Sequence, residues 1–298
     1  MYTKPTLNEH WIAVLRIGTG VVLLACFASL WPEYSRMYGI DGLADVRLFT
    51  LQHPPLGILA AVPAGTWWLL PGYLCLSLLL IAGLATRLTA TLLLLLHYHL
   101  FTSVYAPFSY GVDYLASSCL LYCILFPANG YQATFFLRIL QAHVCIIYFF
   151  AGLGKALGPT WHNGEALWKA VTQPGFESLF KPDLLFLGAY PSLWVAGGWA
   201  VLILELTYPV FIWLPPTRRY WLWAMVGLHL GIALLMGLYS FSALMIVLNL
   251  SAFYMPYLTL AKHKTGLSIP PVPPPATGGE TPAGGVACAD TTGKRPYV

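Results

Sequence analysis

Long apolar runs, separated by short polar segments, make up most of the sequence. An α-helix needs about 20 apolar residues to cross the hydrocarbon core of a bilayer, and eight runs are close to that length. They cover residues 11–31, 67–86, 89–109, 111–130, 136–157, 191–214, 219–238 and 240–260. The pattern predicts an all-α fold, a polytopic integral membrane helical bundle of about eight transmembrane helices.

The composition indicates the same class of protein. Of the 298 residues, 58% are hydrophobic and only 9% are charged, whereas about 25% of the residues of soluble domains are charged. We therefore expect a multi-pass protein of the cell membrane, with the lipid bilayer as its main partner. The net charge of +4 is spread over short loops without a basic run, so we expect no nucleic-acid partner.

The distribution of basic residues predicts the orientation in the membrane. If the N-terminus is inside, the inner loops carry Lys4, Arg87, Arg138, Arg218, Arg219, Lys262 and Lys264. The outer loops then carry Arg36, Arg47, Lys169 and Lys181. Cytoplasmic loops are enriched in Lys and Arg, so the pattern places both termini in the cytoplasm. The first run has no small-residue cleavage site after it, and we expect it to be a retained helix.

Two long loops and a tail lie between or after the apolar runs. The outer loops 32–66 and 158–190 are each expected to hold short interfacial helices, which together would roof an outward-facing cavity. From residue 267 the sequence is rich in proline and glycine, and such a composition does not support a packed core. We therefore divide the chain into a transmembrane domain, residues 1–266, and a disordered tail, residues 267–298.

Ionisable side chains inside the predicted spans are the main candidates for function, because each is costly in a bilayer unless it is paired or hydrated. They are His97, His99, Asp113, His143, Lys155, Glu205 and His229. His97 and His99 are two positions apart and point to different sides of a helix. We therefore expect no metal site on that helix, and the cysteines indicate no disulfide framework or zinc site.

Lys155 stands out within the stretch IYFFAGLGKALGPTW, residues 147–161. Tyr148 and Lys155 are seven residues apart and share a helix face, and Gly152 lies close to that face. A phenol, a backbone opening and an amine would then line one cavity. The alternative is that Lys155 extends to the outer headgroups as an anchor, as lysines at helix ends commonly do.

Glu205 and His229 lie at similar depths in the two following spans. They could form a buried pair of acid and imidazole, in which each charge compensates the other. Equally, Glu205 could be neutral and hydrogen-bonded to a hydroxyl or a backbone group.

Several of these motifs, in this order, resemble the HTTM family, the horizontally transferred transmembrane domain that also forms the membrane part of vitamin K-dependent gamma-carboxylase. The resemblance runs from about residue 11 to 258, beginning with LRIGTGVVLL, and is densest in VCIIYFFAGLGKALGPTWHNG. It continues in ELTYPVF and GLHLGIALLMGLYSFSALMI. Gly111 and Val112 stand where carboxylase-type members carry asparagine and histidine, and Gly154 replaces a second lysine.

This resemblance implies a role for the lysine of the motif. In the carboxylase a lysine in this motif is regarded as the base that deprotonates the reduced quinone cofactor, and Lys155 matches it by position. His229 matches the family's histidine on the seventh helix. The resemblance implies a reduced quinone as cofactor, with Tyr148, Gly152 and Trp161 in its binding site.

Two hypotheses about function remain open at this stage. In the first, the chain is a membrane-embedded enzyme with an outward-facing cavity for a quinol-type or other amphipathic ligand. Lys155 is then the base, and Glu205 and His229 form a supporting buried network. In the second, the chain is a non-catalytic membrane partner in the maturation or export of a secreted peptide or protein, and Lys155 is a structural cap.

Overall fold

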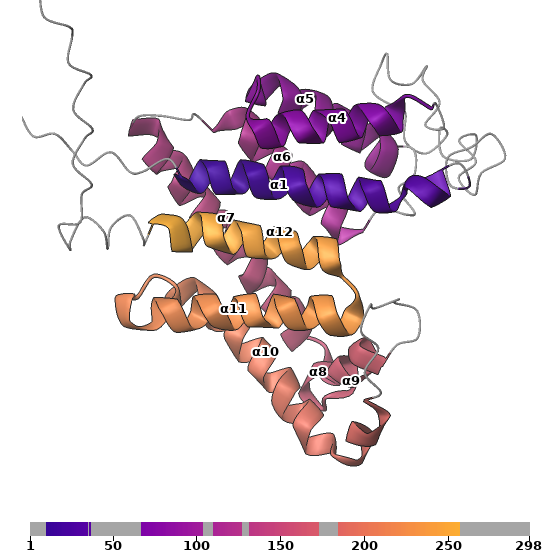
Figure 1. The fold of residues 1–298 in the computed structure, drawn as a ribbon. Helices are drawn as coiled ribbons and strands as arrows, with labels where there is room; N and C mark the ends of the chain where they lie inside the picture. Colours follow the sequence, from indigo (N-terminus) through magenta and orange to yellow (C-terminus); the bar gives the residue numbers. More distant parts are fainter. Residues whose placement is uncertain are drawn as a thin grey trace, which may run out of the picture.

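The regular elements of the protein are helical throughout the described part of the chain (Figure 1). The computed structural model describes residues 10–34, 36, 67–103, 110–126, 131–172 and 184–256. The main helices are α1 (His10–Ser29), α4 (Leu69–Ala82), α5 (Thr86–His97), α6 (Gly111–Leu125), α7 (Tyr131–Ala156), α10 (Pro191–Phe211), α11 (Pro215–Met236) and α12 (Tyr239–Asn249). Each predicted apolar run overlaps one of these helices, which confirms the all-α fold for the described residues.

Four of these helices are long and apolar enough to cross a membrane by themselves. They are His10–Ser29, Gln132–Ala156, Pro191–Phe211 and Pro215–Met236. Three shorter apolar helices accompany them: Leu69–Ala82, Gly111–Leu125 and Tyr239–Tyr254. The protein is thus helical with membrane-like helices, and the larger number of about eight spans stays a prediction.

Short π-helical segments extend two of the helices. The segment η3 (Tyr98–Ser103) follows α5, and η6 (Leu250–Tyr254) follows α12. Such widened turns are frequent at functional sites. Each of them directly follows a buried polar residue, His97 in one case and Asn249 in the other.

Helix ends follow from local sequence. Gly237 ends α11 with φ 69°, a left-handed conformation that glycine adopts without steric cost. At the other end, Pro215 starts the same helix, where its missing N–H is not needed. Gly83 ends α4 with φ 79°, and the Arg16 guanidinium donates hydrogen bonds to the carbonyls of Leu80 and Ile81 in the last turn of that helix.

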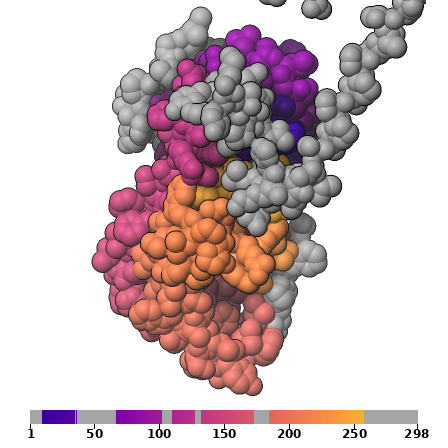
Figure 2. Space-filling view, turned by 90° about the vertical axis from the view of Figure 1, so that its left-hand side faces the viewer, coloured from indigo at the N-terminus to yellow at the C-terminus, as the bar shows by residue number. Residues whose placement is uncertain are grey.

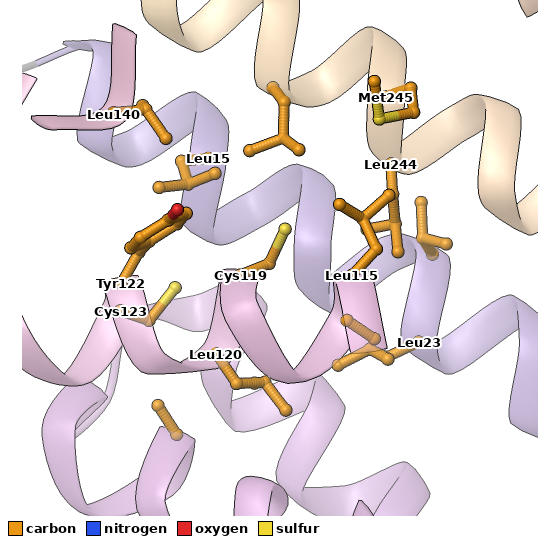
Figure 3. Close-up of a cluster of buried hydrophobic side chains, with 14 of the residues drawn as sticks. Leu15, Leu23, Leu115, Cys119, Leu120, Tyr122, Cys123, Leu140, Leu244 and Met245 are labelled. Atoms are coloured by element: carbon orange, nitrogen blue, oxygen red, sulfur yellow. The ribbon is translucent and has the colours of Figure 1, made fainter. Parts of the chain in front are cut away.

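The labelled residues of a buried apolar cluster come from four helices (Figure 3). Leu15 and Leu23 come from α1, and Cys119 and Cys123 from α6 point into the same space. Leu140 from α7, with Leu244 and Met245 from α12, completes the cluster. Both cysteines are buried and free, so they act here as small apolar side chains.

In Figure 1, α1, α4, α11 and α12 run nearly parallel, whereas α7 and α10 are oblique to them. α10 extends below α11, and the short helices α8 (Pro159–His162) and α9 (Glu165–Thr172) lie beside it. Seen from the end where α11 begins, the purple helices lie at the top and α10 at the bottom (Figure 2). The segment 158–190 therefore does contain short helices, as predicted, including the 3-10 turn Leu185–Ala189 (η5).

Some predictions lie outside the described residues. The proposed tail, residues 267–298, is one of them, as is most of the loop 32–66. Of this loop the structure describes residues 32–34 and 36, and the 3-10 turn Trp31–Glu33 (η1) lies at its start.

Candidate functional site

The helices α7 and α10 approach each other closely at Gly152. A Cβ atom at this position would lie 3.0 Å from Glu205 Cβ and 3.1 Å from the backbone nitrogen of Leu206. Both distances are tighter than ordinary packing allows, so a larger residue would push the helices apart. The prediction that Gly152 opens a cavity was therefore wrong: its missing side chain is filled by the neighbouring helix.

This approach places Lys155 directly against Glu205. The Lys155 Nζ atom donates hydrogen bonds to both carboxylate oxygens, at 2.8 Å to Oε1 and 2.7 Å to Oε2. The Glu205 side chain is only 7% exposed and that of Lys155 is 25% exposed. Glu205 thus pairs with Lys155 and not with His229, and the Lys155 amine turns inward to the carboxylate instead of serving as a free anchor.

The indole of Trp161 covers the other side of the lysine. Lys155 Nζ lies 5.5 Å from the centre of that ring, a distance at which a cation is attracted by the aromatic face. Trp161 belongs to α8, which follows α7 after a short turn. The Lys155 ammonium group therefore contacts the Glu205 carboxylate and lies near the Trp161 indole.

Two glycines fix the position of α8 and α9 on α10. Gly198 faces the Trp161 carbonyl, because a Cβ at residue 198 would come within 2.4 Å of that oxygen. Gly164 has φ +80°, and a Cβ there would lie 2.5 Å from the backbone of Trp194. The segment that begins with Trp161 and ends with Gly164 is thus pressed against α10.

The helix α9 carries an exposed ion pair of its own. Lys169 Nζ lies 2.6 Å from Glu165 Oε1, one helical turn away. The hydrogen bond and the positive charge of Lys169 hold the pKa of the Glu165 carboxyl below its usual range. This exposed pair provides a natural comparison for the sheltered pair of Lys155 and Glu205.

A second polar cluster lies one to two turns deeper along the same helices. The Tyr148 hydroxyl lies 2.9 Å from His229 Nε2, and Asn249 Nδ2 donates to the same hydroxyl at 2.5 Å. Tyr208 donates to the Asn249 carbonyl oxygen at 2.7 Å. All four side chains are buried.

The donors and acceptors of this cluster define the state of the histidine. Because the Tyr148 oxygen already accepts from Asn249, its proton is free to be donated to His229 Nε2. A neutral His229 then carries its own proton on Nδ1, which has no hydrogen-bond partner within the described residues. The N–H at His229 Nδ1 is therefore the one buried donor of this cluster without a partner among the described residues.

The ion pair and this cluster lie along the contact between α7 and α10, and together we call them the acid–base seam. Tyr148 and Lys155 are two turns apart on α7, and Glu205 and Tyr208 are one turn apart on α10. The rings of Tyr148 and Tyr208 lie 4.4 Å apart within the deeper cluster, so both levels are built from the same pair of helices. Pro209 lies four residues after Glu205, so the Glu205 carbonyl lacks the helical N–H that would otherwise bind it.

Another buried network lies across α4, α5 and α6. Tyr73 hydrogen-bonds to His97 Nδ1 at 2.9 Å, and His97 Nε2 lies 3.2 Å from the backbone oxygen of Asp113. The Asp113 carboxylate accepts from the Tyr110 N–H at 2.7 Å and so binds the start of α6. His97 and Asp113 were singled out in the sequence, and the structure brings them together with Tyr73.

Sequence reasoning did not select Tyr73, Tyr208 or Asn249. The signal for Asn249 was present, since it is an amide within the apolar stretch LMIVLNLSAF. Tyr208 follows Glu205 by one helical turn, which was also visible. Tyrosine is common in membrane helices, however, and only the contact with Asn249 distinguishes this one.

The described residues contain no group of three or more His, Cys, Asp or Glu side chains placed to hold a metal ion. The fold and the site thus define a helical protein with membrane-length apolar helices and a buried acid–base seam. No protein-family model matches the chain, and no curated protein or solved structure is significantly similar to it. The likeness to HTTM proteins therefore rests on the sequence motifs alone.

Proposed function

We propose that the chain is an HTTM-like integral membrane protein with about eight spans, and that its α7–α10 seam performs acid–base chemistry on a quinol-type or other amphipathic ligand. The observation that carries the proposal is the sheltered pair of Lys155 and Glu205. The HTTM-like motif, which has its lysine at residue 155, supports it.

The pair can supply a base without creating a net charge. Transfer of one proton from Lys155 Nζ to a Glu205 oxygen, over 2.7 to 2.8 Å, leaves a neutral amine beside a neutral acid. In a site of low dielectric constant, loss of both charges removes their desolvation cost. The amine then accepts the proton of a ligand hydroxyl, and the ligand becomes an anion next to the lysine cation.

The deeper cluster has a positioning role in this proposal. Tyr148 is 2% exposed and its oxygen is bonded to His229 and Asn249. These bonds fix the Tyr148 ring, which packs at a tilt against Tyr208, one turn from Glu205. Tyr148 and His229 thus hold the face of α10 that presents the carboxylate.

Binding and ionisation of a quinol test the proposal directly. Duroquinol, a fully methylated quinol, would be added anaerobically to the purified protein, with equilibrium dialysis to measure binding and ultraviolet absorbance to detect the ionised form. We expect the wild type to bind duroquinol and shift its absorbance, and Lys155→Met to bind it without the shift. Lys169→Met, which removes a lysine from the exposed pair, should behave as the wild type.

Two results would contradict the proposal. One is the absence of duroquinol binding by the wild type, and the other is an unchanged absorbance shift in Lys155→Met. A stoichiometric peptide found with the purified wild type by native mass spectrometry, together with absent quinol binding, would favour the export hypothesis.

A further inference from the structure

A cavity of about 590 Å³ lies between the end of α1, the start of α6 and the turn from α11 to α12. Its walls include Cys26 and Ser29 from α1, Gly111 and Val112 from α6, and Leu238 and Phe241 beside the turn. This volume falls within the range of small-molecule sites, about 300 to 1,000 Å³.

The lining of the cavity selects for neutral, mostly apolar molecules. None of the described residues that line it carries a charged side chain. Hydroxyl groups are nevertheless present, on Ser29, Tyr110, Tyr239 and Ser240. An apolar ring with one or two hydroxyl or carbonyl groups matches this combination, because its body replaces water and its oxygens find partners.

The cavity adjoins the seam through one aromatic contact. The ring of Phe241, in the cavity wall, meets the ring of His229 edge-on with centroids 5.8 Å apart. His229 in turn bonds to Tyr148. The end of α7 that carries Lys155 leads into α8 and α9, which lie at the same end of the bundle as the α11–α12 turn (Figure 1).

The seam itself offers little room for a ligand. Tyr148 is 2% exposed and His229 3% exposed, and at Gly152 the two helices are in close contact. The unpartnered Nδ1 of His229 lies in the ring that touches the cavity wall. A ligand that reacts at the seam therefore needs a neighbouring space to hold its body.

We propose that this cavity, bounded by Cys26, Gly111 and Phe241, is the binding site for the body of a neutral phenol- or quinol-type ligand, beside the acid–base seam. The inference rests on the proposed function for the chemistry of the ligand. It adds a location that none of Lys155, Glu205 and Trp161 defines, since none of them is among the residues that line the cavity.

Gly111 allows the cavity to be filled by substitution. Among the described residues, a Cβ at this position would meet nothing within 4 Å, so Gly111→Leu adds a side chain where those residues leave space. Gly227 on α11 is equally open but does not line the cavity. Gly227→Leu is thus a matched control for the addition of the same side chain.

The experiment combines binding with the reactivity of Cys26. Alkylation of Cys26 by N-ethylmaleimide would be followed by peptide mass spectrometry, with and without duroquinol. At ten times the dissociation constant, we expect duroquinol to slow alkylation about tenfold by mass action. The same protection is expected in Lys155→Met and Gly227→Leu, whereas dialysis should show that Gly111→Leu no longer binds duroquinol.

The outcomes separate this inference from the proposed function. If the wild type binds duroquinol but Cys26 reacts at an unchanged rate, the ligand lies elsewhere and the inference is wrong while the function stands. Undiminished binding of duroquinol by Gly111→Leu would likewise show that the inference is wrong while the proposed function stands. If the wild type binds no duroquinol by dialysis, the proposed function fails, and the inference fails with it.

Discussion

A lysine and a glutamate that face each other between apolar helices depend on one another. Each alone would carry a buried, uncompensated charge, and removal of one partner from such a pair commonly costs several kcal/mol. Lys155 is partly exposed, which lowers that cost. Glu205 is nearly fully buried and lies where Pro209 interrupts the backbone hydrogen bonds of α10, so it depends most on its partner.

A substitution of Lys155 can separate its role as the partner of Glu205 from its proposed role as a base. Arginine forms the same pair with Glu205 but does not give up its proton. We expect Lys155→Arg to keep a melting temperature close to that of the wild type and to lose the absorbance shift of bound duroquinol. Thermal unfolding in detergent and the anaerobic absorbance measurement would check the two parts.

Two further variants test how much Glu205 depends on its partner. Lys155→Met should be destabilised by about 1–3 kcal/mol, since it leaves a buried carboxylate without its donor. Adding Glu205→Gln should recover part of this loss. Full function in Lys155→Arg would show that the lysine is only a structural cap.

At the scale of helices, small residues decide how closely the elements approach. Gly152 brings α7 against α10, and Gly198 brings α10 against the Trp161 carbonyl. Close packing of this kind is a main source of association between membrane helices, where the hydrophobic effect does not act between them. The ion pair lies beside this contact, because Lys155 follows Gly152 by about one turn and Glu205 is the residue that Gly152 faces.

Two glycines of the motif AGLGK give a matched test of this packing. Gly152→Ala adds a methyl group 3.0 Å from Glu205 Cβ, whereas the methyl group of Gly154→Ala meets no described atom within 4 Å. We expect Gly152→Ala to lower the melting temperature. Gly154→Ala should leave it unchanged or raise it slightly, since alanine favours a helix by about 0.5–1 kcal/mol.

Thermal unfolding of both variants in the same detergent would check this prediction. Equal stability of the two would mean that α7 and α10 can separate at residue 152 without cost. The close approach would then have no part in placing Lys155 against Glu205.

At the scale of the molecule, the number and direction of the spans decide which solution the Lys155 end faces. The basic residues of the loops predict both termini in the cytoplasm. This requires an even number of spans. The four long and three shorter apolar helices of the described residues make seven, so the predicted number of eight also needs α5 to cross. The Lys155 end and the cavity beside Phe241 would then face outward.

A reporter fused after residue 265 checks the topology. We expect it to behave as a cytoplasmic protein, active if it is an enzyme that folds only in the cytoplasm. A second fusion within residues 173–183, between α9 and α10, should behave as exported. Export of the first reporter would mean that one apolar helix does not cross the membrane.

The sequence by itself determined the helices and most of the residues worth examining. Apolar runs report burial in a membrane or a core, so the predicted runs coincide with α1, α4, α5, α6, α7, α10, α11 and α12. Charged groups are rare in such runs, and Lys155, Glu205 and His229 were therefore conspicuous. Gly152 and Trp161 were named as well, although the reason for Gly152 was wrong.

Only the tertiary structure decided which of these residues meet. Hydropathy gives the length of a helix but neither its rotation nor its depth against a neighbour, and a hydrogen bond depends on both. Glu205 consequently pairs with Lys155 instead of His229, and His229 bonds to Tyr148, whose hydroxyl also accepts from Asn249. The contact at Gly152, which spans 53 residues of sequence to Glu205, set that rotation because close packing between two backbones allows few alternatives.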